Sequence, residues 1–96
     1  MSLLTIHLMI TGLKILQINV NKSLAITEHV LQVAVELLIE VIAIQEPWII
    51  KETDLLYRSV THSGFKQILP DQALARPRTL FYISNKVLAT LAPSSL

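Results

Sequence analysis

The stretch Leu13–Trp48 constrains the fold more than any other part of the chain. Its first segment, Leu13–Val20, is apolar and rich in leucine and isoleucine, which predicts a buried strand. Ser23 then follows as an N-cap residue, whose hydroxyl can accept a backbone N–H at the start of a helix. Val41–Ile44 is a second short apolar run, and Pro47 ends it because proline has no N–H to donate. The stretch therefore predicts strand, helix and strand in that order.

The predicted helix runs from Ser23 to about Leu38 and is amphipathic. Polar residues recur at every fourth position and predict a solvated face: Glu28, Gln32, Glu36 and Glu40. The apolar positions between them are expected to face the core: Val30, Leu31, Ala34, Leu37 and Leu38.

A helix this short between two strands predicts a right-handed parallel crossover. The C-terminal ends of both strands then lie at one edge of the sheet, where open α/β sheets bind ligands. Asn19 lies at the end of the first strand and Glu46 at the end of the second. An amide and a carboxylate at this edge can hold a hard cation through oxygen ligands.

Two motifs in this stretch resemble a known family. INVNKS followed by IAIQEPW resembles the first two motifs of the endonuclease/exonuclease/phosphatase superfamily, especially the apurinic-like endonuclease domain of fungal non-LTR retrotransposons. Those domains end their first strand in Asn-x-Asn or Asn-x-Asp, and their second in Gln-Glu-Pro and an aromatic residue. The later segment RPRTLFYISNKV resembles the strand that follows in the family. The resemblance covers roughly Leu13–Ala89.

The resemblance implies an α/β fold that is the N-terminal part of a two-sheet sandwich, with strand, helix and strand followed by further strands. It also implies a Mg²⁺-dependent nuclease (Mn²⁺ is an alternative metal) that cleaves phosphodiester bonds in DNA, located in the nucleus. Glu46 matches the family's metal-binding catalytic carboxylate, and Asn19 matches the catalytic-site residue that orients it. The resemblance also implies Asn21 as a second metal ligand, where some relatives have an aspartate, although a neutral amide binds a hard cation less well. The alternatives are a solvated strand-end carboxylate for Glu46 and a turn-forming amide for Asn19.

The chain departs from the family where the later catalytic motifs would stand. The family's hydrolysis needs an Asp-x-Asn segment that holds the attacking water, and a late Asp-His pair. Asp54 and Asp71 are the aspartates of this chain, and neither is followed by Asn two residues on. Catalytic groups act as a unit, so their loss lowers the rate by many orders of magnitude. We therefore expect a truncated retroelement endonuclease domain that is inactive alone, and whether the chain is an enzyme stays open.

Other candidate residues have plainer interpretations. Trp48 is expected to pack over the rim of the sheet rather than stack on a base. Tyr82 is expected in the core or on a sheet face, and His62 in a loop, facing solvent without a partner. Four basic residues could contact phosphates, although a solvated surface is the default interpretation: Lys66, Arg76, Arg78 and Lys86.

Turn and strand residues predict the structure of the remaining segments. We expect a loop with room for one short helical turn over Ile49–Ser63, then a strand over Phe65–Leu69. A connection follows over Pro70–Pro77, and a second strand over Thr79–Ser84. Asn85 and Lys86 are expected to form a hairpin turn, and Val87–Leu91 a returning strand. This gives three divisions: residues 1–12 as an apolar leader or extra strand, 13–92 as the partial domain, and 93–96 as a tail.

Composition excludes some classes of protein. The 96 residues suffice for one small domain, and 52% apolar with 16% charged residues excludes a disordered chain. The net charge of +1 gives no global signature of nucleic-acid binding. The absence of cysteine excludes disulfides and thiolate sites, and the three histidines lack metal-ligand spacing: His7, His29 and His62.

Two further hypotheses stay open beside the nuclease. A half sandwich exposes an apolar sheet face, so the chain could be a non-catalytic module that self-associates through that sheet. The mean hydropathy of +0.56 suits buried parallel strands or a piece of a larger core. The last hypothesis is a small membrane-associated protein that uses Met1–Val20. However, Lys14 would be costly at bilayer depth, so we expect no membrane.

Overall fold

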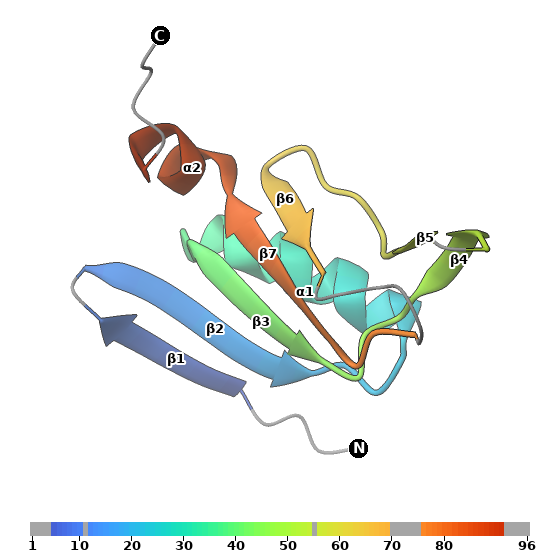
Figure 1. Cartoon of the computed structure of the whole chain (residues 1–96). Coiled ribbons are helices and arrows are strands. Elements are labelled where there is room, and N and C mark those ends of the chain that lie inside the picture. The colour runs from blue at the N-terminus through green and yellow to red at the C-terminus, as the bar shows by residue number, and fades with distance from the viewer. Residues whose placement is uncertain (1–4, 11, 55, 70–75, 92–96) are drawn as a thin grey trace, which may run out of the picture.

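The computed structural model describes residues 5–10, 12–54, 56–69 and 76–91. Its main feature is a five-stranded sheet in the order β1-β2-β3-β7-β6 (Figure 1). The strands are β1 (Thr5–Ile10), β2 (Leu13–Asn19), β3 (Val41–Gln45), β6 (Phe65–Ile68) and β7 (Thr79–Ser84). β2 and β3 are parallel, and every other neighbouring pair is antiparallel. The expected α/β class and the crossover from β2 to β3 are confirmed.

The crossover helix is α1 (Leu24–Glu36). It begins as predicted, because the Ser23 Oγ accepts a hydrogen bond from the Ile26 N–H at 3.1 Å. The buried positions on its inner face are Thr27, Val30, Leu31 and Ala34. The prediction was wrong for Leu37 and Leu38, which are 49% and 65% exposed. The helix ends before them, and Leu38 takes a φ of +59°, so both residues leave the helical face.

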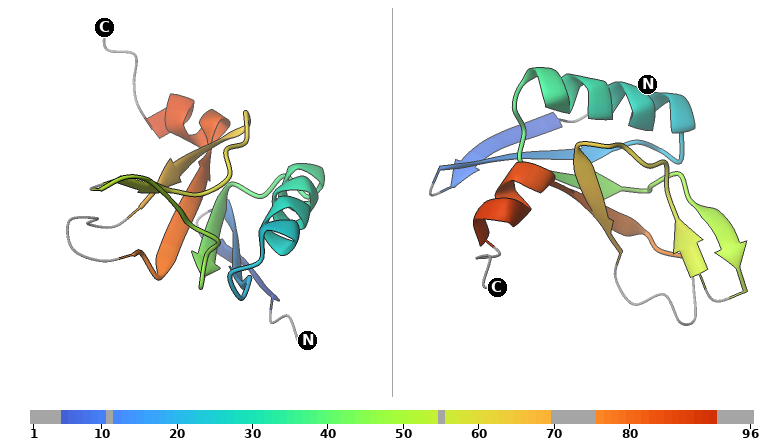
Figure 2. Two further views of the ribbon diagram at one scale, coloured as in Figure 1. Left: turned by 90° about the vertical axis from the view of Figure 1, so that its right-hand side faces the viewer. Right: turned by 90° about the horizontal axis from the view of Figure 1, so that it is seen from above.

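One face of the sheet forms the core under α1 (Figure 2). Cross-strand partners make two buried rows on this face: Leu16, Ile42 and Tyr82, then Ile18, Ile44 and Leu80. Directly paired residues point to the same side of a sheet, so both rows belong to the core that also contains the inner face of α1.

The opposite face of the sheet is also apolar, and we call it the open face. Its apolar members come from β2, β3, β6 and β7: Ile15, Val41, Ala43, Ile68, Phe81 and Ile83. Phe81 and Ile68 are directly paired there and remain 41% and 42% exposed. The exposed apolar surface expected of a half sandwich is therefore present.

The predicted loop over Ile49–Ser63 contains two strands that the sequence analysis missed. β4 (Ile50–Thr53) and β5 (Leu56–Arg58) form a separate antiparallel pair with an irregularity between Lys51 and Thr53. An ion pair between Glu52 and Arg58 joins them. Strands this short carry too few residues to show a period of two in sequence.

The predicted hairpin turn and returning strand after β7 were wrong, because this segment is the helix α2 (Asn85–Leu91). β7 already pairs with β3 on one side and β6 on the other, so a returning strand has no free edge to join. The helix begins where the Lys86 N–H donates to the Ser84 Oγ at 3.1 Å. Thr90 Oγ1 donates to the Lys86 carbonyl one turn back, at 3.0 Å.

The N-terminal segment was expected as a leader or an extra strand, and the structure shows the strand. β1 pairs antiparallel with β2 from Leu13 to Ile18 and forms one edge of the sheet. Residues 70–75 of the predicted connection and the predicted tail, 93–96, lie outside the described residues. Within the described part of the chain, no helix has the length and apolar character needed to cross a membrane.

Candidate functional site

The C-terminal ends of β2 and β3 meet as predicted. Asn19 is the direct cross-strand partner of Gln45, and Glu46 is the next residue along the chain. The Val20 N–H continues the ladder by donating to the Gln45 carbonyl at 3.1 Å. The backbone therefore brings Asn19 and Glu46 to one edge of the sheet, which we call the candidate edge.

The chain leaves β2 through a tight turn. The Ser23 N–H donates to the Val20 carbonyl at 3.0 Å, and both central residues have left-handed φ values, +51° at Asn21 and +60° at Lys22. This is the geometry of a type I′ turn. The Lys22 N–H donates in turn to the Glu46 carbonyl at 2.7 Å, so the turn is fixed directly against Glu46.

Glu46 is held by backbone on both sides. Its N–H donates to the Arg78 carbonyl at 3.0 Å, and its carbonyl accepts from Lys22. Its φ of +50° is left-handed, an unfavourable conformation for a residue with a Cβ and for one that precedes proline. Such a conformation costs on the order of 1 kcal/mol and persists only where the surroundings fix it. The side chain is half-buried.

Asn19 has a clear structural role at the candidate edge. Its Oδ1 accepts a hydrogen bond from the Asn21 N–H at 2.8 Å, so it forms the turn considered as its alternative role. Asn19 and Asn21 are both exposed. The contact takes up part of the acceptor capacity of Asn19 and orients its amide at the strand end.

The candidate edge carries a small set of oxygen donors. Among the described residues, no group of three His, Cys, Asp or Glu side chains could hold a metal. Mg²⁺, however, is usually bound by one or two carboxylates and keeps several waters. Glu46 supplies one carboxylate, and no described residue donates a hydrogen bond to it. Asn19 and Asn21 have amide oxygens at the same edge of the sheet, and that of Asn19 already accepts the Asn21 N–H.

The four basic residues proposed for phosphate contact do not form one patch. Arg78 lies just before β7 and beside Glu46, whereas Lys86 lies just after β7. A strand of this length spans roughly 20 Å. Lys66 pairs with Ile83 near the far end. Arg76 belongs to the near end, where its Nη1 donates to the Ile49 carbonyl at 2.8 Å.

Tyr82 lies in the core as predicted, whereas the packing of Trp48 over the rim of the sheet stays a prediction. Tyr82 is fully buried in the core, and its hydroxyl donates to the Val60 carbonyl at 2.7 Å. This burial raises the pKa of Tyr82 above its ordinary value. Trp48 is half-buried after β3.

His62 lies outside the strands and helices, as predicted for a loop residue, but it is half-buried and has partners, so that part of the prediction was wrong. Its Nδ1 accepts a hydrogen bond from the Gly64 N–H at 2.9 Å, and its ring packs edge-on against Phe65 with centroids 5.5 Å apart. These contacts depend on the turn before β6, which cannot be predicted from a single histidine in the sequence.

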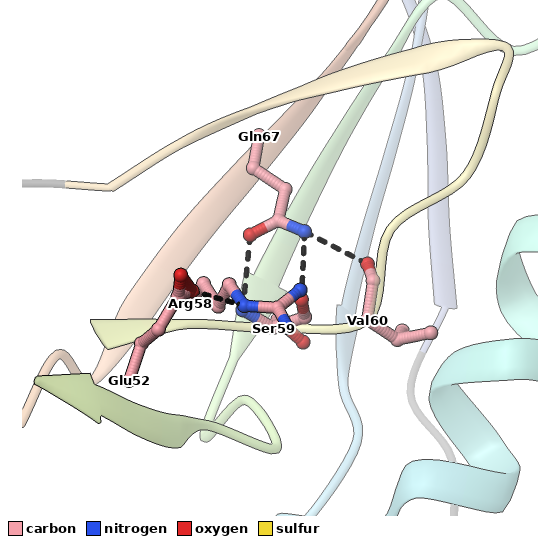
Figure 3. A network of polar contacts seen from close by, with 5 residues as sticks. All are labelled: Glu52, Arg58, Ser59, Val60 and Gln67. Atoms are coloured by element: carbon pink, nitrogen blue, oxygen red, sulfur yellow. Dashed lines mark hydrogen bonds and ion pairs between the residues drawn. The ribbon is translucent and has the colours of Figure 1, made fainter. Parts of the chain in front are cut away.

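Gln67 organises a polar network that the sequence analysis did not find (Figure 3). Its Oε1 accepts from the Ser59 N–H at 2.9 Å, and its Nε2 donates to the carbonyls of Ser59 and Val60 at 2.8 and 2.9 Å. Gln67 is the cross-strand partner of the buried Tyr82. A polar residue at a strand position that faces the core is the sequence signal from which this network could have been predicted. The network ties the segment after β5 to the sheet.

An open hollow of about 540 Å³ lies at the other end of the sheet, between the C-terminal end of α1 and the start of α2. Leu38, Lys14 and Lys86 are among its lining residues. Asn19, Asn21 and Glu46 do not line this hollow, so it is separate from the candidate edge.

Comparisons with protein-family models, with curated proteins and with solved structures find no match for this chain.

Proposed function

We propose that the chain is part of a Mg²⁺-dependent phosphodiesterase of the endonuclease/exonuclease/phosphatase type, derived from a retroelement endonuclease domain, with DNA as substrate. One observation carries the proposal. The parallel pairing of β2 and β3 puts Asn19 beside the strand end that leads into Glu46, and backbone hydrogen bonds fix Glu46 from both sides. The left-handed φ of Glu46 adds support, because strained residues cluster at functional sites.

In this proposal Glu46 holds the metal, with Asn19 and Asn21 beside it. Bound Mg²⁺ supplies charge neutralisation at a scissile phosphate. The groups that position the attacking water in the resembling family have no counterpart in this sequence. Any hydrolysis by this chain alone is therefore expected to be many orders of magnitude slower than that of a complete site.

A plasmid-nicking assay at high protein concentration and long incubation tests this function. Any conversion of supercoiled to open-circular DNA by the chain alone should be close to background, should require Mg²⁺ and should be lost in Glu46→Gln. Glu36→Gln is a matched control, because Glu36 is exposed at the C-terminal end of α1. Nicking that continues in EDTA, or that is equal in Glu46→Gln, would contradict the assignment.

A second candidate function is a non-catalytic module that self-associates through the open face. The exposure of the paired residues Phe81 and Ile68 favours it, because contiguous exposed apolar surface marks interaction sites. Sedimentation velocity should find a defined oligomer without Mg²⁺, and the double variant F81K/I68K should be a monomer. A monomeric parent chain at high concentration would argue against this function.

A further inference from the structure

Two cationic residues are fixed on either side of Glu46. Lys22 donates its N–H to the Glu46 carbonyl at 2.7 Å, and Arg78 accepts the Glu46 N–H at 3.0 Å. Both side chains are exposed. Within the part of the chain that the structure describes, neither side chain makes a hydrogen bond or an ion pair. Each is therefore available to a ligand at the candidate edge.

Lys22 stands in a position that the backbone favours for glycine. The third residue of a type I′ turn has positive φ, and Lys22 has +60°. A lysine side chain there lowers stability relative to glycine, so the fold alone does not favour it. The cost is explained if the ammonium group has a use at this edge.

The surroundings of Lys22 favour an anionic ligand. Lys22 directly precedes Ser23, the N-cap of α1, and the first turn of this helix contains no acidic residue. The exposed N–H groups at a helix start add positive potential to that of the two side chains. Glu46, whose backbone is hydrogen-bonded to the backbone of both residues, is half-buried. This arrangement suits a chain of phosphates that passes over the carboxylate.

We propose that Lys22 and Arg78 bind backbone phosphates of a DNA strand next to the phosphate at Glu46. The inference rests on the proposed function, since it names the groups that hold the substrate at the same site. Contacts of this kind position a strand without reading its sequence, and they make affinity depend on salt. The two residues are positioning residues, because neither takes part in the bond cleavage.

The test measures binding of the full chain to a fluorescent single-stranded DNA oligonucleotide by anisotropy, in EDTA, so that neither metal nor hydrolysis contributes. Lys22→Gly and Arg78→Gln should each weaken binding roughly three- to ten-fold at 0.1 M salt. Each should also lower the slope of log Kd against log salt by about one. Lys66→Gln is the matched control at the far end of the sheet and should bind like the parent chain.

The variants are chosen so that misfolding does not decide the result. Glycine fits the φ of Lys22, so Lys22→Gly should keep the thermal midpoint of the parent chain or raise it. Equal affinity of Lys22→Gly and the parent chain, with an unchanged salt slope, would overturn the proposal. So would equal loss of affinity in Lys66→Gln.

Two further measurements distinguish the phosphate contacts from the proposed metal site and from binding to another polyanion. Glu46→Gln in EDTA should bind the oligonucleotide at least as well as the parent chain, whether or not Glu46 proves to be a metal ligand. Failure of the proposed function is thus distinguishable from failure of the phosphate contacts. Vesicles of phosphatidylserine supply the other polyanion. Tighter binding to these vesicles than to the oligonucleotide, with the same sensitivity to Lys22→Gly, would overturn the assignment to DNA.

Discussion

Both faces of the five-stranded sheet are apolar, but among the described residues only one face is buried under other elements. Along β7, Leu80 and Tyr82 have no exposed surface, whereas Phe81 between them is 41% exposed. An antiparallel sheet with one solvated face ordinarily alternates apolar and polar side chains. The sheet of this chain instead has the side-chain pattern of a layer between two others. α1 supplies the first of those layers, and the open face has the character of a surface that a partner sheet or a second chain would cover.

The largest expected difference between the faces is in core truncation. Ile44→Ala removes a buried side chain under α1 and should lower the free energy of unfolding by about 2–5 kcal/mol. Phe81→Ala removes a larger side chain from the open face and should cost less, because its transfer from water is incomplete. Urea unfolding of both variants measures the two costs. Equal costs would mean that the open face is covered in solution.

The polar network on the covered side should give the next largest effect. Gln67→Ala removes three hydrogen bonds to the segment at Ser59 and Val60 and leaves buried backbone groups unpaired. The expected loss is about 1–3 kcal/mol in the free energy of unfolding. Gln17→Ala is the control, since Gln17 lies in the row of Phe81 on the open face and should cost little. A loss as large for Gln17 as for Gln67 would contradict the difference between the faces.

Tyr82→Phe tests one hydrogen bond of the covered face. Loss of the bond to the Val60 carbonyl should cost about 1 kcal/mol near neutral pH, since Gln67 still donates to the same oxygen. Because burial raises the pKa of Tyr82 above 10.0, the folded state keeps the phenolic proton more tightly than the unfolded state. Stability of the parent chain is then complete below pH 10 and falls as the pH rises above 10 toward the folded pKa. Phe has no proton to lose, so the gap between the two proteins should narrow with pH in urea unfolding. A gap that widens above pH 10 would contradict a buried phenol.

The smallest expected change in the free energy of unfolding is at the C-terminal end of α1, the helix that covers the core face. Leu38 is exposed and has a left-handed φ just after α1, at a position where helices commonly have glycine. Leu38→Gly should therefore raise the free energy of unfolding by about 0.5 kcal/mol, because it removes the strain. Thermal unfolding measures the gain, with Leu37→Gly as a control that should instead destabilise, since Leu37 has a negative φ. A stability loss in Leu38→Gly would show that the exposed leucine is packed in solution.

Local signals carried most of what the sequence predicted. Ser23 caps α1, the apolar runs form β2 and β3, and Phe65 begins β6. Each of these features depends on neighbours within a few residues. The pairing of Asn19 with Gln45, next to Glu46, was predictable from topology, because the C-terminal ends of parallel strands lie at the same edge of a sheet.

The missed features depend on contacts between distant segments. Val87–Leu91 has apolar residues that suit a strand or a helix, and only the occupied edges of β7 exclude the strand. The positions of Lys22 and Arg78 beside Glu46 depend on two backbone hydrogen bonds between segments far apart in sequence. No local pattern reports such bonds, so the cationic neighbours of Glu46 were missed although its own position was predicted.

The most direct test of the central claim, a metal-binding carboxylate at Glu46, is a Mn²⁺ titration of the chain followed by electron paramagnetic resonance of the free ion. The account predicts one weak site with a Kd on the order of 0.1–1 mM, as expected for a single carboxylate. Glu46→Gln should weaken it by roughly ten-fold or more, because the site loses its only charged ligand. Glu36→Gln, exposed at the end of α1, should leave the titration unchanged. Equal Mn²⁺ binding by Glu46→Gln and the parent chain would contradict the account.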